Sequence, residues 1–227
     1  MKLLFFDIDG TLIRSRGAGR NAVETGMTRF FRQPIRSNGI AFSGKTDPQI
    51  LAEVLILNGL EPNEANIQKA AIAYATVLEE QLSTDTYAVI EGIPSILDQL
   101  LAHPDAELSL LTGNFEKTAF LKLASANLDA YFHHGAFGSD HADRNALPPI
   151  GLARVFRETG RRFLPHEAYI IGDTPLDIAC ARAHGLHAIA VATGYFSTDA
   201  LAQHQPDLLL KDFSDPTPLF HYIFGAP

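Results

Sequence analysis

A short apolar run that ends in two acids constrains the fold of this chain more than any other stretch. Residues 3–6 read Leu-Leu-Phe-Phe and lead directly into Asp7, and Asp9 and Gly10 follow after one further residue. The run is apolar on both faces and too short for an independent helix, so it predicts a buried strand of a parallel sheet. Ligands of open α/β sheets bind at the carboxyl ends of the strands, and glycine lets the backbone approach a ligand closely. Two carboxylates at this position therefore predict a functional site.

Composition limits the classes of protein to consider. A chain of 227 residues corresponds to one domain, or to a core with a smaller insert. The formal net charge is -8 and basic residues do not cluster, which argues against nucleic acid and anionic membranes as partners. Cys180 is the only cysteine, so no intramolecular disulfide is expected. No leader peptide and no apolar run of membrane-spanning length is recognised, so we expect a cytoplasmic protein. The oligomeric state is not indicated.

Residues 14–88 carry three amphipathic helical patterns and no convincing strand, which predicts a small all-helical module inserted after the first strand. The second of these helices is expected to begin with Asp47 as its N-cap and Pro48 at the first helical position. We expect hinges near residues 13–15 and 87–90, where the module joins the rest of the chain.

From residue 89 onwards, strand and helix patterns alternate. This alternation predicts an α/β fold with a Rossmann-like parallel sheet and helices on both faces, formed by residues 1–13 and 89–227, with residues 14–88 as a separate helical domain. The remaining strands are predicted at residues 107–111, 136–138, 168–171, 187–192 and 207–210. The helices between them are predicted at residues 93–101, 115–126, 147–159 and 175–184.

Polar groups follow the ends of three predicted strands. Asp7 and Asp9 follow the first, Thr112-Gly113-Asn114 (residues 112–114) follows a later one, and Asp173 follows a third, with Asp177 at the start of the next helix. Carboxylates that converge at one sheet edge need a counter-charge, and oxygen ligands suit Mg²⁺. The Thr112 hydroxyl and the backbone N–H groups of the turn after it are typical of anion binding.

These residues resemble the motifs of the haloacid dehalogenase-like hydrolases, and in the same order. Residues 7–11 (Asp-Ile-Asp-Gly-Thr) resemble the first motif, residues 110–114 the second and residues 171–177 the fourth. The resemblance spans residues 3 to about 194. The helical insert is similar to the small cap of phosphoglycolate phosphatase-like members of this family.

The resemblance implies a role for each matching residue. Asp7 would be the nucleophile that forms an aspartyl-phosphate, and Asp9 the general acid and then the general base. Mg²⁺ would be held by Asp7, the Asp9 backbone carbonyl and Asp173, with Asp177 binding through water or orienting Asp173. The phosphoryl oxygens would be bound by Gly10, Thr112, Gly113 and Asn114. The implied reaction is hydrolysis of a small phosphorylated metabolite, and the cap type suggests phosphoglycolate.

The third motif departs from the family pattern. A lysine is expected in the loop after the third strand, whereas residues 139–145 contain none. Arg144 is the nearest cation and can bind a phosphate through two parallel hydrogen bonds. Lys122, on the preceding helix, is the alternative for the same role.

Other activities of the family fit the sequence less well. A dehalogenase or a phosphonatase of this type does not need the second acid of the first motif, so the presence of Asp9 favours phosphoryl transfer. A phosphomutase keeps both acids and stays open. A non-catalytic binding protein on this fold also stays open, although the retention of both acids argues against it.

A second phosphate-binding pattern lies in the predicted cap. Residues 39–46 fit G-x-x-x-x-G-K-[ST], the phosphate-binding loop of P-loop nucleotide-binding proteins. That loop should follow a buried strand, and here a helical stretch precedes it. We interpret residues 44–47 as a cap loop, in which Lys45 either contacts an anionic substrate or is solvated.

Overall fold

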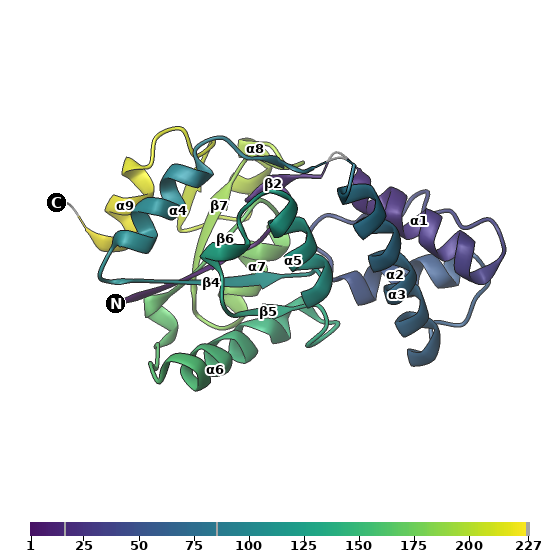
Figure 1. Ribbon diagram of the computed structural model, residues 1–227. Helices are drawn as coiled ribbons and strands as arrows, with labels where there is room; N and C mark the ends of the chain where they lie inside the picture. The colour runs from purple at the N-terminus through teal and green to yellow at the C-terminus, as the bar shows by residue number, and fades with distance from the viewer. Residues whose placement is uncertain (16, 85, 226–227) are drawn as a thin grey trace.

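The computed structural model describes residues 1–15, 17–84 and 86–225. An α/β core and a group of three packed helices lie side by side, and the chain enters and leaves the helical group on the same side (Figure 1). The three helices are α1 (Ala18–Phe31), α2 (Asp47–Leu57) and α3 (Glu64–Leu82). They occupy the stretch predicted to be all-helical, and we keep the term cap for residues 14–88 as a proposal.

The core contains a six-stranded, fully parallel sheet in the order β5-β4-β1-β6-β7-β8. The strands are β1 (Lys2–Phe6), β4 (Ala106–Thr112), β5 (Gly135–Phe137), β6 (Ala168–Gly172), β7 (His187–Val191) and β8 (Leu208–Leu210). The run that carries the two acids is therefore the third strand of six, with neighbours on both sides. Strands in this position are buried on both faces, which is why residues 3–6 are apolar without alternation.

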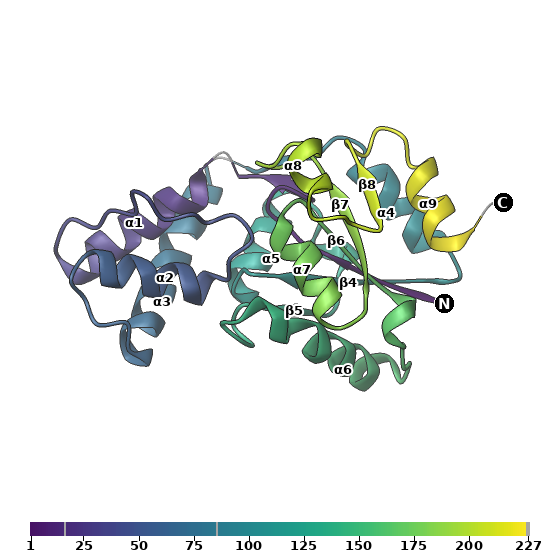
Figure 2. The same cartoon turned by 180° about the vertical axis from the view of Figure 1, so that it is seen from behind.

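Alternate side chains of β1 belong to two separate apolar clusters. Leu4 and Phe6 pack with α4, α5 and α9 on one face, and Leu3 and Phe5 pack with α6, α7 and α8 on the other (Figures 1 and 2). The flanking helices and short 3₁₀ segments are α4 (Ile93–Ala102), α5 (Glu116–Ser125), η1 (Asp129–Tyr131), η2 (Arg144–Ala146), α6 (Leu147–Thr159), η3 (Pro165–Glu167), α7 (Pro175–Ala183), α8 (Thr198–Ala202) and α9 (Thr217–Phe224).

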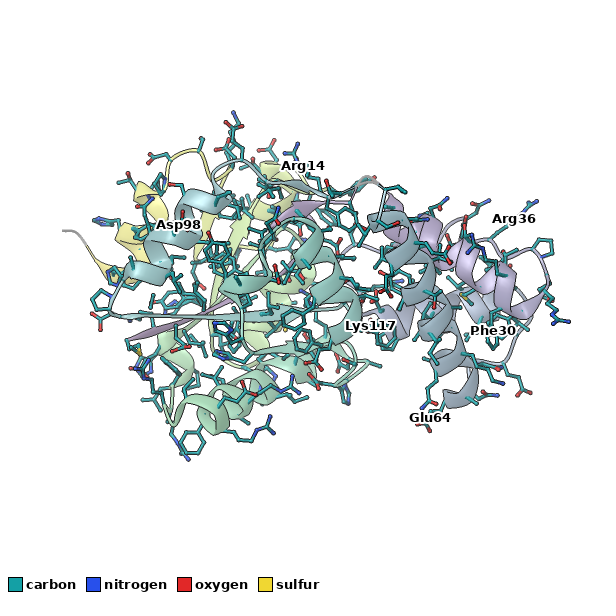
Figure 3. The ribbon with its side chains drawn as sticks, viewed as in Figure 1. Arg14, Phe30, Arg36, Glu64, Asp98 and Lys117 are labelled. Atoms are coloured by element: carbon teal, nitrogen blue, oxygen red, sulfur yellow. The ribbon has the colours of Figure 1, made fainter. Side chains whose placement is uncertain are left out.

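Two short strands join the core to the helical module. β2 (Ile13–Arg14) pairs antiparallel with β3 (Ala88–Val89), so the outgoing and returning chain segments lie beside each other. The expectation that residues 14–88 contain no strand was therefore wrong at both ends. Segments of two residues are too short to give a hydrophobic period, and only their mutual pairing defines them. Arg14 is visible at this junction in Figure 3.

The start of α2 also differs from the prediction. Thr46, not Asp47, is the N-cap: its hydroxyl accepts from the Gln49 N–H, and the Gln49 side chain accepts from the Thr46 N–H. Asp47 is the first helical residue, and its carboxylate points away from α2 and accepts a hydrogen bond from the Phe115 N–H of the core. Both residues are good caps by type, so the sequence alone did not distinguish them.

The prediction of an α/β fold with a parallel sheet, helices on both faces and an inserted helical part is confirmed. Helices α8 and α9 were not predicted, because one is a single short turn and the other follows a proline-rich segment. Residues 39–46 lie in the connection between α1 and α2 and do not follow a strand, so the context that a P-loop requires is missing. Among the described helices, none is both long and apolar enough to cross a membrane.

Candidate active site

The predicted site residues meet at the carboxyl edge of the sheet. β1 lies between β4 and β6, with Phe6 aligned to Leu110 and Ile171, so the residues after each strand converge. They line a cavity of about 690 Å³ between the sheet edge and the helical module. Its wall includes these predicted residues: Asp7, Asp9, Gly10, Lys45, Thr112, Gly113, Asn114, Lys122, Arg144 and Asp173. Asp177 lies behind this wall.

A tight turn after β1 presents Asp9 and Gly10. The Ile8 carbonyl accepts from the N–H groups of both Leu12 and Ile13, at 2.9 and 3.1 Å. Gly10 has a φ of 87°, and a Cβ there would lie 2.4 Å from Asp173 Oδ2. Glycine is therefore required at this position both by its left-handed backbone and by the close carboxylate.

Three buried carboxylates form the centre of the site. Asp7, Asp173 and Asp177 each offer an oxygen within 4.8 Å of the others. Burial raises the pKa of Asp7 to about 6, opposed by the positive charge of Arg144 and assisted by the charge of Asp177. Burial raises the pKa of Asp173 well above its usual range, and the charges of Asp177 and Asp7 raise it further. The three carboxylates thus repel one another in a poorly solvated space.

Asp177 supports the cluster from behind. One of its oxygens accepts from the Thr174 N–H at 3.0 Å and the Thr174 hydroxyl at 2.7 Å, and the other pairs with Arg144. A Cβ on Gly172 would lie 2.2 Å from the carboxyl carbon of Asp177, so this glycine makes room for the acid. Both oxygens of Asp177 have protein partners, which favours its predicted role in orienting the cluster over direct metal binding.

The charges around the cluster fit a bound divalent cation. Within the described residues, Arg144 is the one guanidinium close to the three buried carboxylates, so one positive charge faces up to three negative ones. All the donors are oxygens, as Mg²⁺ prefers. Glycines leave room for Asp173: a Cβ on Gly194 would lie 1.6 Å from its Oδ2. The residues present therefore suit Mg²⁺, and Asp7 and Asp173 are the two carboxylates of the cluster that also line the cavity.

Arg144 and Lys122, the two candidates for the missing third-motif lysine, occupy different positions. Arg144 is 5% exposed, and its Nη2 lies 3.4 Å from Asp7 Oδ1 and pairs with Asp177. Lys122 is 4% exposed, and its Nζ lies 2.6 Å from Asp9 Oδ2. Arg144 thus faces the predicted nucleophile and Lys122 the predicted general acid.

Segment 44–47 of the cap contacts the core beside the site. The Gly44 carbonyl accepts from Arg144 Nη1 at 3.2 Å, and the Asp47 N–H donates to the Gly113 carbonyl at 2.7 Å. A Cβ on Gly113 would lie 2.2 Å from the Lys45 carbonyl oxygen, so this glycine allows the two backbones to meet. Further along this boundary, the Lys117 ammonium of α5 pairs with Glu79 of α3 at 3.5 Å, and Figure 3 labels Lys117 where the two parts face each other.

The predicted contact of Lys45 with an anionic substrate stays a prediction. Its ammonium lines the cavity and is paired with both carboxylate oxygens of Glu53 at 2.7 Å. A substrate anion would therefore compete with Glu53 for this lysine.

Sequence reasoning missed Thr193 and Gly194 and the contact that Asp47 makes with the core. Thr193 donates to the Gly10 carbonyl at 2.6 Å, Gly194 makes room for Asp173, and Asp47 accepts from the Phe115 N–H at 2.9 Å. Thr193 and Gly194 follow the strand next to β6, so the strand-end argument could have found them. The role of Asp47 depends on the packing of cap on core, which the local pattern did not indicate.

Replacing Asp47 with asparagine is expected to stabilise the protein increasingly as the pH rises. Burial raises the pKa of Asp47 to about 6, although Lys122 and the Phe115 N–H both lower it. Because the pKa of Asp47 is higher in the folded protein than in the unfolded chain, folding favours the protonated carboxyl. The stability is therefore greatest below the unfolded pKa and is lost as the pH rises through the folded pKa of about 6. Asparagine keeps the oxygen that accepts from Phe115 and Thr118 but carries no charge.

The gain in unfolding free energy of Asp47→Asn over wild type is therefore expected to grow by about 1 to 2 kcal/mol between pH 5 and pH 7.5. Urea unfolding at the two pH values, with EDTA in both, measures it. Asp98→Asn, on the surface of α4, serves as the matched control. If the stability gain of Asp47→Asn instead shrank with rising pH, the raised pKa of Asp47 would be contradicted.

Comparison with known proteins identifies the family. A model of the haloacid dehalogenase-like hydrolase family matches residues 4–191, which is most of the chain. The chain therefore belongs to this family, and the predicted resemblance to it is confirmed.

The individual relatives have low sequence identity to this chain. The phosphoglycolate phosphatase 1 of Pseudomonas aeruginosa is 25% identical over 219 residues, covering 96% of this chain and 79% of that protein. The crystal structure of CbbY from Rhodobacter sphaeroides in complex with phosphate has a TM-score of 0.74 at 16% identity and covers 95% and 96% of the two chains. A candidate β-phosphoglucomutase from Thermotoga maritima has a TM-score of 0.63 at 16% identity and covers 99% and 100%. At these identities the two structures support the fold alone.

Proposed function

We propose that this protein is a Mg²⁺-dependent phosphatase that hydrolyses a small phosphate monoester through an aspartyl-phosphate on Asp7. The observation that carries the proposal is the pairing of the buried Asp7 carboxylate with Arg144 at 3.4 Å, inside a cluster of three carboxylates at a strand edge. Membership of the hydrolase family and relatives named phosphoglycolate phosphatase support the same reaction class.

In the first step, a carboxylate oxygen of Asp7 attacks the phosphorus and the bond to the ester oxygen breaks. Asp9 gives its proton to the leaving alcohol. Arg144, together with Thr112 and the backbone at Gly113, supplies donors to the phosphoryl oxygens as charge shifts toward the leaving group.

In the second step, water attacks the phosphorus of the aspartyl-phosphate and Asp9 takes a proton from that water. The bond between Asp7 and phosphorus breaks, inorganic phosphate leaves, and the Asp7 carboxylate is restored. The Asp9 side chain is 34% exposed and lines the cavity, where it can reach the leaving alcohol and the attacking water. Mg²⁺ held by Asp7, the Asp9 carbonyl and Asp173 would neutralise charge on the phosphoryl group.

Mg²⁺ is expected to raise the melting temperature of the wild type and to leave that of Asp173→Asn unchanged. At a concentration of 100 times Kd, a ligand adds about 2.7 kcal/mol of stability. Because the pKa of Asp7 is raised to about 6, protons compete with the metal below that pH, so the shift should shrink as the pH falls. Thermal melts with Mg²⁺ and with EDTA measure it. An equal shift in Asp173→Asn would contradict this metal site.

The decisive test of the activity is release of inorganic phosphate from a panel of small monoesters in the presence of Mg²⁺. We propose phosphoglycolate as the first substrate to test, because it is the name the sequence relatives carry. Phosphate release that depends on Mg²⁺ and is lost in Asp7→Asn supports the proposal. No release from any monoester with folded, Mg²⁺-loaded protein would refute it.

A phosphomutase is the second candidate, since both acids of the first motif are present and a candidate β-phosphoglucomutase shares the fold. A mutase returns the phosphoryl group to a sugar instead of to water. Isomerisation of a sugar phosphate that outpaces phosphate release would favour it over the phosphatase.

A further inference from the structure

Lys122 is buried against Asp9, the second acid of the first motif, and its ammonium forms no ion pair or hydrogen bond with Asp7. Its ammonium donates to Asp9 Oδ2 at 2.6 Å and to Asn114 Oδ1 at 2.5 Å. Asn114 in turn donates to the same Asp9 oxygen at 2.9 Å and to the Thr112 hydroxyl at 2.8 Å. The result is a closed ring of hydrogen bonds among Lys122, Asn114 and Asp9, tied to the end of β4 through Thr112.

This ring is asymmetric with respect to the Asp9 carboxylate. Both donors bind Oδ2, whereas Oδ1 accepts from no residue within ranges 1–15, 17–84 and 86–225. Lys122 and Asn114 are buried, while the Asp9 side chain is 34% exposed and lines the cavity. One oxygen of Asp9 is therefore held from the protein side, and the other is left for a ligand in the cavity.

A buried lysine needs such partners to stay charged. Burial lowers the pKa of Lys122, and the negative charge of Asp9 more than offsets this, so its pKa lies well above the usual range. Tyr74 and Asp47, from the helical module, also raise it. The two hydrogen bonds that Asp9 Oδ2 accepts, from the Lys122 ammonium and the Asn114 amide, fix the Asp9 carboxylate in one orientation.

We propose that Lys122 is a positioning residue that orients Asp9 for proton transfer to the leaving group, while Arg144 alone fills the role of the third-motif cation on the phosphoryl group. This inference rests on the proposed phosphatase activity. It separates two cations that the motif pattern left as alternatives for one role.

The proposal predicts that the effect of removing Lys122 depends on the leaving group. Lys122→Met is expected to lower kcat/KM about 100-fold for an alkyl phosphate such as phosphoglycolate, because a misoriented Asp9 no longer delivers the proton. For p-nitrophenyl phosphate the loss should be below about 10-fold, since nitrophenolate leaves without a proton. Inhibition by inorganic phosphate should change less than about 3-fold, because the phosphate-binding groups are intact.

Two further variants make the result specific. Asp9→Asn should show the same dependence on the leaving group, and adding Lys122→Met to it should cause little further loss, because both act on one proton transfer. Arg144→Met should instead lose activity with both substrates and weaken inhibition by phosphate. If Lys122→Met does not fold, Lys122→Arg, which keeps the charge on a different geometry, is expected to show a smaller loss with the same preference for p-nitrophenyl phosphate.

Equal losses of kcat/KM with the two substrates, or weaker inhibition by phosphate in Lys122→Met, would overturn the proposal. The first outcome indicates a structural role and the second a phosphate-binding role for Lys122. A wild type that releases phosphate from no monoester of the panel refutes the phosphatase itself, so failure of the phosphatase proposal is distinguishable from failure of the Lys122 proposal.

Discussion

Replacing Asp7 with asparagine is expected to lower kcat/KM for every phosphate monoester by at least about 10⁴-fold. Asparagine keeps the size of the side chain and can still accept a hydrogen bond from Arg144, but its amide oxygen cannot form an aspartyl-phosphate. The loss should be independent of the leaving group, because the nucleophile is needed for every substrate. Phosphate release with p-nitrophenyl phosphate and phosphoglycolate, each with Mg²⁺, measures it.

The fold should tolerate this change. Asp7 carries a raised pKa in a cluster of three carboxylates, so removing its charge relieves repulsion within the cluster. Urea unfolding in EDTA is therefore expected to show Asp7→Asn at least as stable as wild type. Activity within tenfold of wild type would rule out Asp7 as nucleophile, whereas an unfolded variant would contradict the account of its electrostatics.

Replacing Arg144 with methionine is expected to cause the second largest loss, in both activity and stability. Arg144 is buried against Asp7 and Asp177, so its removal leaves their charges without a protein counter-ion. Breaking a buried ion pair from one side costs about 3 to 5 kcal/mol. Loss of a guanidinium from a phosphoryl transition state costs about 10³-fold in kcat. Urea unfolding and phosphate release measure the two effects.

Matched variants test the cause of these losses. Arg144→Lys should recover part of the activity, since it restores the charge that the family pattern has here but not the second hydrogen bond to the Gly44 carbonyl. Arg161→Met removes a guanidinium from an exposed pair with Glu107 and should change the unfolding free energy by less than about 1 kcal/mol. An Arg144→Met protein as stable and active as Arg161→Met would contradict the proposed role of Arg144.

Site residues located at the carboxyl ends of strands were predictable from the sequence. Asp7, Thr112 and Asp173 each follow an apolar run, and parallel strands bring such positions to one edge whatever the details of packing. The helix boundaries at residues 147–159 agree with the prediction, because proline and glycine mark both ends.

Residues that act across the boundary between cap and core were not predictable in the same way. Asp47 fits the pattern of a helix cap, and only the approach of residues 44–47 to Gly113 reveals that its carboxylate binds Phe115 and Thr118. Lys122 and Arg144 are 22 positions apart in the numbering and were alternatives for one role. Lys122 pairs with Asp9 and Arg144 with Asp7 because the two cations approach β1 from different sides. The periodicity of the sequence does not specify these sides.

The central claim is that Asp7 carries the phosphoryl group during turnover. The most direct measurement is an acid quench of the Mg²⁺-loaded enzyme during hydrolysis of phosphoglycolate, or of whichever monoester the panel identifies. Borohydride reduction, which converts an aspartyl-phosphate to homoserine, and peptide mass spectrometry then follow. We predict homoserine at position 7, absent in Asp7→Asn and when EDTA replaces Mg²⁺. Continued phosphate release with an unmodified Asp7 at every quench time, or homoserine at Asp9 or Asp173 instead, would contradict the account.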